Sequence, residues 1–320
     1  MKIISGTSNT ALAEGIANLF GTKLVDVENS QFANGERRVW VKEEVRGQKV
    51  AIVQSLSEPT DQHIIELLLM IDALDRVGAR HINVVIPWLG YSLQDKVFRD
   101  GEPIAAKVIA NLISNSGVRR AFLLDLHNSS TPGFFSIPTQ HLSAMSVFVT
   151  YAEANFKKEN LVVASPDFGG LKRARVFAEK LGVELVNVDK QRDLSTGETK
   201  ATNVSGNVNG KIVIVFDDVI NAGGTVVNCA EILKARGAAE VHFFATHGLF
   251  ADNGQAKINA SMIDTVIVTN SIPSMTMSAS GLDLSSGGIL PSGATQNAPS
   301  KIHYLDSSQL FADALRAWLE

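Results

Sequence analysis

Apolar residues follow two alternating patterns along this chain. Short runs rich in Val, Ile and Ala alternate with longer segments, such as 64–74, whose apolar positions recur at the period of an α-helix. Strands that alternate with helices in this way favour parallel sheets, so the pattern predicts an α/β fold. The predicted strands are Ile3–Ser5, Val50–Gln54, Ile82–Ile86, Ala121–Leu126, Leu161–Ser165, Ile212–Phe216, Val241–Thr246 and Thr265–Val268.

Two parts of the chain resemble each other. Residues 47–54 align with residues 209–216, and residues 73–82 align with residues 232–241. Both copies combine a strand, a loop, a helix that ends in glycine and a further strand. Internal similarity of this kind indicates a duplicated domain.

The duplication and the changes in composition predict two domains. We place the first at 1–147 and the second at 148–303, each a mostly parallel sheet flanked by helices. Residues 274–300, which are rich in Ser and Gly and almost without charge, are predicted to form a loop. Spaced apolar residues within 304–320 predict an amphipathic helix, which we expect to dock on the N-terminal domain.

Composition argues against several classes of protein. The 320 residues carry a net charge of −4, which does not suit a nucleic-acid-binding protein. The N-terminus lacks the basic and then apolar pattern of a signal peptide, and no apolar run is long enough to span a membrane. The single cysteine, Cys229, excludes an internal disulfide and fits a reducing compartment. We therefore expect a soluble cytoplasmic protein.

The most informative motif starts where the predicted strand Ile212–Phe216 ends. Asp217 and Asp218 follow it, and a Gly-Gly-Thr turn at 223–225 leads into a helical pattern. In an open α/β sheet, ligands bind at the carboxyl ends of strands, and a helix N-terminus there suits a phosphate. The two carboxylates can accept hydrogen bonds from two sugar hydroxyls. The motif resembles the phosphoribosyl-binding loop of type I phosphoribosyltransferases and their relatives; the alternative is an acidic turn before a helix.

Two other strand ends carry candidate ligands. Asp167 follows the strand 161–165 and precedes two glycines and three cations. Its carboxylate could hold Mg²⁺, which prefers hard oxygen ligands, or the segment could be a helix start with a solvated basic face. His127 ends the run 121–126 and is either a ligand or a structural histidine.

Three loops contribute further candidates. The turn 31–36 places Phe32 beside polar residues, so its ring could stack on a base, with a plain hairpin turn as the alternative. The loop 87–99 clusters aromatic and charged residues, as a nucleotide contact or a subunit contact would. Lys190 and Arg192 stand two positions apart on an extended segment and therefore point to one side. They could close over a polyphosphate, unless the segment is a solvated loop.

Together and in this order, these segments resemble ribose-phosphate pyrophosphokinases (phosphoribosyl-diphosphate synthetases) over nearly the whole chain. The resemblance implies two type I phosphoribosyltransferase-like domains, of which the second keeps the sugar-phosphate site. It implies transfer of the β,γ-diphosphoryl group of MgATP to the C1 hydroxyl of ribose 5-phosphate, with release of AMP, in nucleotide biosynthesis. It also implies Mg²⁺ as a cofactor and assembly of the chain into dimers and hexamers.

The resemblance assigns roles to individual residues. Lys190 and Arg192 match the pair that stabilises the transition state, and His127 and Asp167 match residues associated with magnesium. The ribose-5-phosphate loop would consist of Asp217, Asp218, Asn221, Ala222, Gly223, Gly224 and Thr225. The ATP site would consist of Phe32, Asn34, Gly35 and Glu36 from a neighbouring subunit, with Gln94 and Asp95.

Three positions depart from the pattern of that family. Leu93 stands where the family has Arg, and Asn221 and Ala222 stand where Asp and Thr are usual. The change at Leu93 removes a cation expected at the nucleotide, which Lys96 or Arg99 could supply instead. Two alternatives therefore stay open. One is a weakly active or inactive regulatory homologue that associates with an active synthetase, and the other is a salvage phosphoribosyltransferase.

Overall fold

The computed structural model describes residues 1–192, 199–273 and 300–319. The chain divides into two compact units. The first unit comprises Met1–Ser143, Asn270–Ser274 and Asp306–Glu320, and the second comprises Ala144–Thr269 and Met275–Leu305. The predicted domain limits 1–147 and 148–303 stay a prediction. The predicted loop at 274–300 lies outside the described residues, apart from Ser300.

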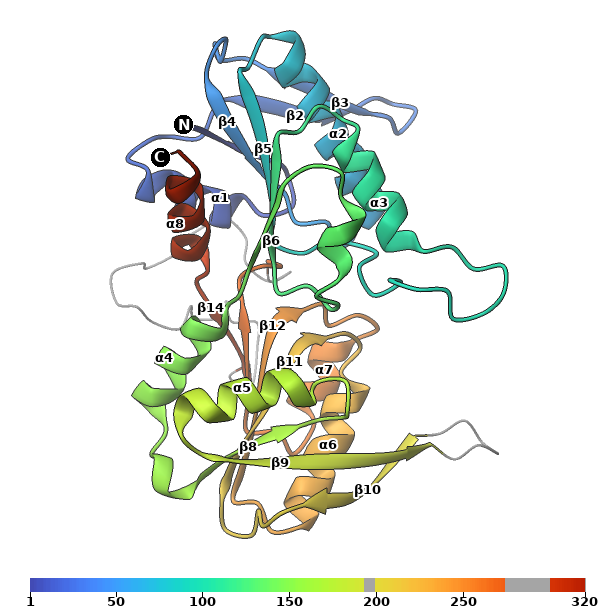
Figure 1. Ribbon diagram of the computed structural model, residues 1–320, viewed down its shortest axis with the longest axis vertical. Helices are drawn as coiled ribbons and strands as arrows, with labels where there is room; N and C mark the ends of the chain where they lie inside the picture. The colour runs from blue at the N-terminus through green and yellow to red at the C-terminus, as the bar shows by residue number, and fades with distance from the viewer. Residues whose placement is uncertain (193–198, 274–299, 320) are drawn as a thin grey trace. The chain divides into compact units, whose positions relative to one another are not determined.

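The first unit is built on a five-stranded parallel sheet in the order β1-β4-β5-β6-β7 (Figure 1). Its strands are β1 (Lys2–Ser5), β4 (Lys49–Val53), β5 (His81–Ile86), β6 (Arg120–Leu124) and β7 (Thr139–Leu142). Its helices are α1 (Thr10–Leu19), α2 (Thr60–Arg76), α3 (Ala105–Ser114), the short 3₁₀ helix η1 (Thr131–Phe134) and α8 (Ser308–Leu319). A separate antiparallel hairpin joins β2 (Val27–Gln31) to β3 (Arg37–Val41).

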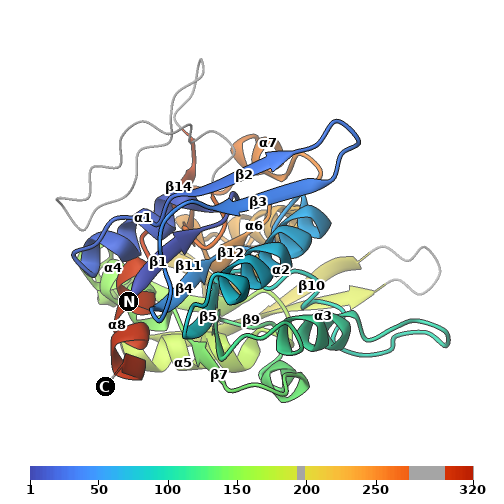
Figure 2. The same ribbon diagram turned by 90° about the horizontal axis from the view of Figure 1, so that it is seen from above.

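The C-terminal helix α8 packs beside α1 within the first unit, as two views show (Figures 1 and 2). A glycine at the contact permits the close approach, since a Cβ at Gly15 would lie 3.0 Å from the Cβ of Ser308. At the other end of α8, the Arg316 guanidinium donates a hydrogen bond to the carbonyl of Leu19. The amphipathic pattern at the C-terminus therefore serves to cover α1.

The second unit contains a seven-stranded sheet in the order β10-β9-β8-β11-β12-β13-β14. Neighbouring strands are parallel, except that β9 and β10 are antiparallel. The strands are β8 (Leu161–Ser165), β9 (Glu184–Arg192), β10 (Thr199–Ser205), β11 (Ile212–Ile220), β12 (Glu240–Gly248), β13 (Thr265–Thr269) and β14 (Ile302–Leu305). The helices are α4 (Met145–Asn155), the 3₁₀ helix η2 (Lys158–Asn160), α5 (Leu171–Leu181), α6 (Gly224–Ala235) and α7 (Gly254–Asn259).

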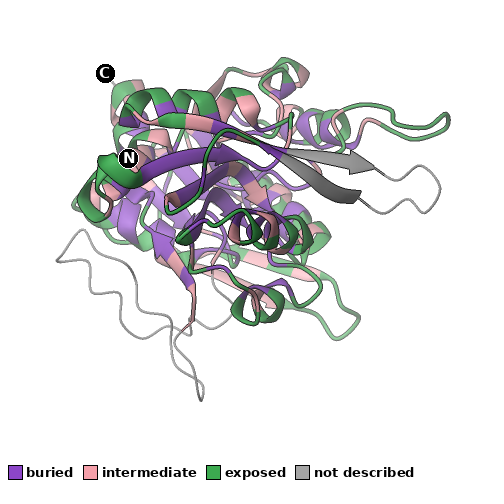
Figure 3. Cartoon of the chain, turned by 90° about the horizontal axis from the view of Figure 1, so that it is seen from below, coloured by how far each residue is buried: buried purple, intermediate pink, exposed green. Residues whose placement is uncertain are grey.

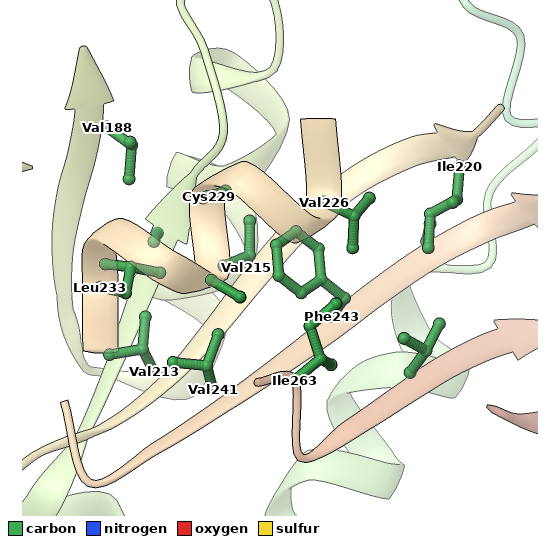
Figure 4. Packing of buried hydrophobic residues seen from close by; sticks show 14 of the residues in the cluster. Val188, Val213, Val215, Ile220, Val226, Cys229, Leu233, Val241, Phe243 and Ile263 are labelled. Atoms are coloured by element: carbon green, nitrogen blue, oxygen red, sulfur yellow. The ribbon is translucent and has the colours of Figure 1, made fainter. Parts of the chain in front are cut away.

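Side chains of β11 alternate between two buried faces. Val213 and Val215 pack with Cys229 of α6 (Figure 4). On the opposite face, the ring of Phe216 stacks on Phe177 of α5 with centroids 4.3 Å apart. Burial on both faces explains the nearly continuous apolar run in the sequence. Across the chain, strands are mostly buried, whereas helices carry exposed residues on their outer faces (Figure 3). The predicted α/β class with mostly parallel sheets is confirmed.

The two units repeat one local structure. In the first unit the backbone N–H of Gly47 donates to the carbonyl of Gly78 at 2.7 Å, and in the second Gly210 donates to Gly237 at 2.8 Å. The φ angles of these glycines are 70°, 83°, 71° and 86°, a region that favours glycine. Each pair clamps the start of a central strand to the end of the helix that follows it. The shared geometry supports the duplication predicted from the sequence.

The structure shifts one part of the internal alignment by a residue. The equivalent of Gly47 is Gly210, not the preceding asparagine with which sequence comparison paired it, because the two glycines make the same backbone hydrogen bond. Counted from this point along β4 and β11, the acidic pair 217–218 corresponds to Gln54 and Ser55.

The first unit fills this equivalent position with a buried polar network. The carboxyl group of the fully buried Glu66 accepts hydrogen bonds from the Thr7 backbone N–H at 2.7 Å, the Thr7 hydroxyl at 2.8 Å and the Gln54 amide at 3.1 Å. The Gln54 amide oxygen accepts two more, from the Ser8 hydroxyl at 2.7 Å and the Ser8 backbone N–H at 3.2 Å. Protein groups therefore satisfy one another here, where the second unit carries two carboxylates.

Replacing Glu66 with alanine is expected to destabilise the protein by about 2 kcal/mol, because it removes the acceptor of the buried Gln54 amide and of two hydrogen bonds from Thr7. Chemical denaturation followed by intrinsic fluorescence measures the change. Glu14→Ala, at an exposed position of α1, is the matched control and should stay within about 0.5 kcal/mol of the unsubstituted protein. Equal stability of the two variants would show that the network contributes nothing.

Candidate functional site

The strand that carries the acidic pair is longer than the sequence predicts. β11 does not end at Phe216 but continues to Ile220, and Asp217 pairs with Ala245 of β12 in parallel register. The expectation that the carboxylates follow the strand was therefore wrong. Pairing with the neighbouring strand outweighs the low strand preference of aspartate. Strand geometry, with Phe216 anchored in the core beneath, holds the carboxyl groups in place.

Arg173 joins the two carboxylates. Its Nη1 lies 2.6 Å from Oδ1 of Asp217 and 2.6 Å from Oδ1 of Asp218. The side chain of Asp218 is 5% exposed and that of Arg173 is 25% exposed, so water screens this contact much less than a surface ion pair. Arg173 stands in the first turn of α5, which follows β8, and β8 is the neighbour of β11. Strand order therefore brings these distant residues together.

Gly170 lets the loop after β8 approach the acidic pair. A Cβ at this position would lie 3.2 Å from Oδ1 of Asp217 and 3.2 Å from Oγ of Ser165. The backbone N–H of Gly170 donates to Oδ1 of Asp167 at 3.0 Å, and the Ser165 hydroxyl donates to the Asp167 carbonyl at 2.6 Å. The loop thus holds Asp167 at the same strand ends as Asp217.

Burial raises the pKa of the Asp217 carboxyl to about 7, the neighbouring Asp218 adds to the rise, and the Arg173 guanidinium opposes it. Between the ordinary pKa of 3.8 and about 7, the folded protein holds a proton that the unfolded chain has lost. Stability contributed by this group is therefore lost as pH rises through that window, and the loss is complete above about 7. The site carries a stability cost at neutral pH.

Asp217→Asn removes this cost and is expected to stabilise the fold at alkaline pH. The gain should be on the order of 2 kcal/mol, or a few degrees in Tm, at pH 8, and smaller at pH 5. Asp218 keeps a carboxylate beside Arg173 in this variant. Thermal unfolding at the two pH values measures the difference. A Tm gain that is larger at pH 5 would contradict the assignment of the raised pKa to Asp217.

The other predicted ribose-5-phosphate residues form the turn from β11 into α6. Gly223 caps α6 with a φ of 78°, and no side chain caps the helix in its place. The carbonyl of Asn221 accepts a backbone hydrogen bond at 3.0 Å from the segment after β12, which fixes the turn. Gly224 and Thr225 are exposed, as is Asn221, whereas Ala222 is half-buried. The first backbone N–H groups of a helix lack partners within it, so this turn suits an anion.

The two predicted catalytic residues lie at the end of β9. Backbone pairing in antiparallel register places Lys190 opposite Ala201 and Arg192 opposite Thr199 of β10. The side chains of Lys190 and Arg192 lie outside the described part of the structure. β9 therefore extends as far as the cationic pair.

The predicted adenine-binding residues form the tip of the β2–β3 hairpin in the first unit (Figure 2). The backbone N–H of Phe32 donates to the carbonyl of Glu36 at 2.8 Å, and that of Gly35 donates to the carbonyl of Phe32 at 2.9 Å. The Glu36 N–H donates to Oδ1 of Asn34 at 3.2 Å. All four residues are exposed, and the Phe32 ring is 53% exposed. The turn can therefore offer an aromatic face to a ligand.

Gln94, Asp95 and His127 follow the carboxyl ends of two adjacent strands, β5 and β6. The amide of Asn128, next to His127, donates to Oδ2 of Asp95 at 2.5 Å, which ties the two loops together. Gln94 and His127 are exposed, and Leu93 is half-buried. The first unit thus brings Gln94, Asp95 and His127 to the same edge of its five-stranded sheet.

The donor set suits Mg²⁺ held partly by substrate. Among residues 1–192, 199–273 and 300–319, no three His, Cys, Asp or Glu side chains gather into a group that could hold a metal ion. Mg²⁺ usually binds through one or two carboxylates together with substrate phosphates and water, so a full protein cage is not required. The half-buried carboxylate of Asp167 fits such a site.

Comparison with known proteins identifies the family. Residues 1–117 match the family described as the N-terminal domain of ribose phosphate pyrophosphokinase, and residues 186–319 match the phosphoribosyl synthetase-associated domain. A ribose-phosphate pyrophosphokinase of Brucella melitensis is 41% identical over 315 residues, which cover 98% of this chain and 96% of that protein. The chain belongs to the ribose-phosphate pyrophosphokinase family.

Other members of the ribose-phosphate pyrophosphokinase family agree with this assignment. The protein of Rhizobium meliloti is 43% identical over 272 residues, covering 85% of this chain and 87% of that protein. The crystal structure of phosphoribosylpyrophosphate synthetase from Mycobacterium smegmatis is similar with a TM-score of 0.85 and 31% identity, covering 99% and 98% of the two chains. Among the helices of the described residues, none has the length and apolarity to cross a membrane.

Arg173 is the residue at the acidic pair that the sequence motifs did not reveal. From the sequence it is one of three cations that follow Asp167, and a solvated basic face explains such a group. The order of the strands in the sheet could have revealed it. Once β8 and β11 are taken as neighbours in a parallel sheet, the first turn of α5 must lie beside the carboxyl end of β11.

Proposed function

We propose that this member of the ribose-phosphate pyrophosphokinase family transfers the diphosphoryl group of MgATP to the C1 hydroxyl of ribose 5-phosphate. The products are 5-phosphoribosyl 1-diphosphate and AMP. The observation that carries the proposal is the acidic pair near the carboxyl end of β11, together with the turn after that strand, in which the positive-φ Gly223 caps α6. This arrangement matches a sugar with two hydroxyls at one end and a phosphate at the other.

The second unit supplies the groups for the acceptor. Asp217 and Asp218 accept hydrogen bonds from the ribose hydroxyls, and backbone N–H groups from Gly223 to Thr225 donate to the 5-phosphate. Held at both ends, the sugar presents its C1 hydroxyl in one orientation. Positioning of this kind can account for a large part of the rate, because phosphoryl transfer needs little covalent help from the protein.

The charge of the transferred group is offset by cations. Lys190 and Arg192 neutralise negative charge that develops on the diphosphoryl group. Mg²⁺, when bound, supplies further charge neutralisation on the phosphate oxygens. Asp167 and His127 are the residues that we assign to it, Asp167 through a carboxylate oxygen and His127 through an imidazole nitrogen.

The first unit supplies the nucleotide contacts. The Phe32 ring stacks on the adenine, while Asn34, Gly35 and Glu36 contact its edge, and Gln94 and Asp95 complete the ATP site. We propose that the hairpin tip serves the ATP site of a neighbouring copy, so that the active form is a homo-oligomer built from dimers, up to a hexamer. The exposed hairpin tip supports this part of the proposal. The reaction is assigned to the cytoplasm, which suits a chain with one cysteine.

The deciding experiment is an assay of AMP release. The purified protein is incubated with Mg²⁺, ribose 5-phosphate and either ATP or another nucleoside triphosphate. AMP that forms only when ribose 5-phosphate is present supports the proposal. A folded protein that forms no AMP favours a regulatory homologue. Leu93, in the place of the family's arginine, is the reason to consider that alternative. In a parallel incubation with 5-phosphoribosyl 1-diphosphate, pyrophosphate release that requires a free base would instead indicate a salvage phosphoribosyltransferase.

A further inference from the structure

Arg173 contacts the acidic pair but has no assigned role in the proposed reaction. Nη1, a single nitrogen atom, bridges one oxygen from each member of the acidic pair, at 2.6 Å in both cases. The side chains of Asp217 and Asp218 are 21% and 5% exposed. Two adjacent carboxylates in such surroundings repel each other strongly, because water screens them poorly. A cation between them offsets that repulsion.

Its neighbours in the helix behave differently. Lys172 and Arg175 flank Arg173 within the same turn of α5, and both are exposed. The sequence alone presents the three cations as one group, whereas the fold directs one of them to the acidic pair. Arg173 is therefore distinguished by its partners and not by its place at the start of a helix.

Carboxylates that bind two hydroxyl groups of one sugar must be held in a fixed orientation. Oδ1 of Asp217 also accepts the backbone N–H of Asp218 at 2.9 Å, so Arg173 and the backbone together determine how this carboxylate is turned. The Gly170 backbone also lies close to this carboxylate, since a Cβ there would be 3.2 Å from the same oxygen. The acidic pair is thus set in one orientation before a ligand arrives, which lowers the entropy lost on binding.

The geometry points to Arg173 as a positioning residue for the acceptor sugar: it holds both carboxyl groups in the orientation in which they accept the hydroxyls of ribose 5-phosphate. This inference rests on the proposed function and adds a residue to it. Arg173 acts through the carboxylates, whereas Lys190 and Arg192 are assigned to the diphosphoryl group. Loss of Arg173 should therefore weaken binding of the sugar and leave binding of the nucleotide alone.

The test compares Arg173→Ala, Arg173→Lys and the control Arg175→Ala. Arg173→Ala should raise the KM for ribose 5-phosphate by about 10- to 100-fold, the effect of losing charged hydrogen bonds. The KM for ATP should change by no more than about twofold. Arg173→Lys keeps a positive charge that can reach both carboxylates and should recover part of the loss. Arg175→Ala, on the exposed side of the same turn, should match the unsubstituted protein.

Three results would overturn the inference. One is an unchanged KM for ribose 5-phosphate in Arg173→Ala. Another is an equal rise in both KM values, which would indicate a structural ion pair between α5 and β11. The third is no recovery in Arg173→Lys when its Tm equals that of the unsubstituted protein.

A failure of the proposed function is distinguished by calorimetric titration with ribose 5-phosphate alone. If the unsubstituted protein releases no AMP yet binds the sugar, a weaker affinity in Arg173→Lys and Arg173→Ala still supports the inference, and an equal affinity overturns it. If the unsubstituted protein neither releases AMP nor binds the sugar, both the proposed function and the inference are wrong.

Discussion

Replacing Lys190 with alanine is expected to lower kcat by at least about 10³-fold, the order of effect seen when a cation that stabilises a phosphoryl-transfer transition state is lost. Lys190 lies at the end of β9, where antiparallel pairing with β10 carries the chain on as a two-stranded extension. Such an extension can bring a cation over a bound polyphosphate without disturbing the nucleotide or sugar sites. The KM for ATP should therefore be largely kept.

Steady-state turnover and ATP binding are measured on the same preparation. Lys200→Ala is the matched control, because Lys200 belongs to the same hairpin but pairs through its backbone with Gln191. Its kcat should stay close to that of the unsubstituted protein. Near-normal turnover of Lys190→Ala would remove the catalytic role, and an equal loss in both variants would assign the effect to the hairpin as a whole.

The sequence predicted the central strands well and the peripheral strands poorly. Central strands such as β8 and β12 are buried on both faces, so their apolar runs are distinctive. Strands β7 and β10 lie at sheet edges and β14 is short, and their composition is more polar. Such strands form because a neighbour offers backbone partners, a cause that no local pattern records.

The extension of β11 has the same origin. Asp217 and Asp218 have a low preference for strands, and the sequence therefore favours a turn at this point. The neighbouring strand β12 reaches Gly248 and offers partners as far as Ile220, so the strand continues. The change matters for the site, since pairing with β12 fixes the backbone that carries the two carboxylates, and Arg173 bridges them.

The sequence indicated the duplication, but it did not show which residues of the first unit stand at the positions of the acidic pair. The predicted alignment of 47–54 with 209–216 is shifted by one residue, since such a shift leaves the apolar pattern of a doubly buried strand nearly unchanged. The backbone hydrogen bonds of Gly47 and Gly210 remove this ambiguity. By this criterion, Gln54 and Ser55 of the first unit are equivalent to Asp217 and Asp218 of the second. One unit therefore satisfies its polar groups internally, and the other carries the acidic pair that we assign to the sugar.

This contrast has an energetic counterpart. Burial and the adjacent carboxyl raise the pKa of Asp217 to about 7, a sign that its charged form is costly in the folded protein. Functional sites commonly retain such a cost because the destabilising groups are those that bind substrate. In the first unit, Gln54 at the equivalent position is neutral and hydrogen-bonded to Glu66. A substitution of the carboxylates should therefore trade activity for stability.

The double substitution Asp217→Asn and Asp218→Asn is expected to lower kcat/KM for ribose 5-phosphate by about 10³-fold or more, since two charge-assisted hydrogen bonds to the sugar become neutral ones. Asparagine has nearly the shape of aspartate, so packing above Phe216 is preserved. The effect on kcat/KM for ATP at saturating ribose 5-phosphate should be smaller, because the acidic pair is assigned to the sugar. Initial rates with each substrate varied in turn give both values.

Asp72→Asn, at an exposed ion pair of α2, is the matched control and should keep full activity. Thermal unfolding separates the role of the pair from its effect on the fold. A double variant that is inactive yet unfolds at the same temperature or higher identifies the carboxylates as substrate-binding groups. One that keeps its kcat/KM for ribose 5-phosphate would show that the sugar binds elsewhere, and the assignment of the β11 carboxyl end to the acceptor would then be wrong.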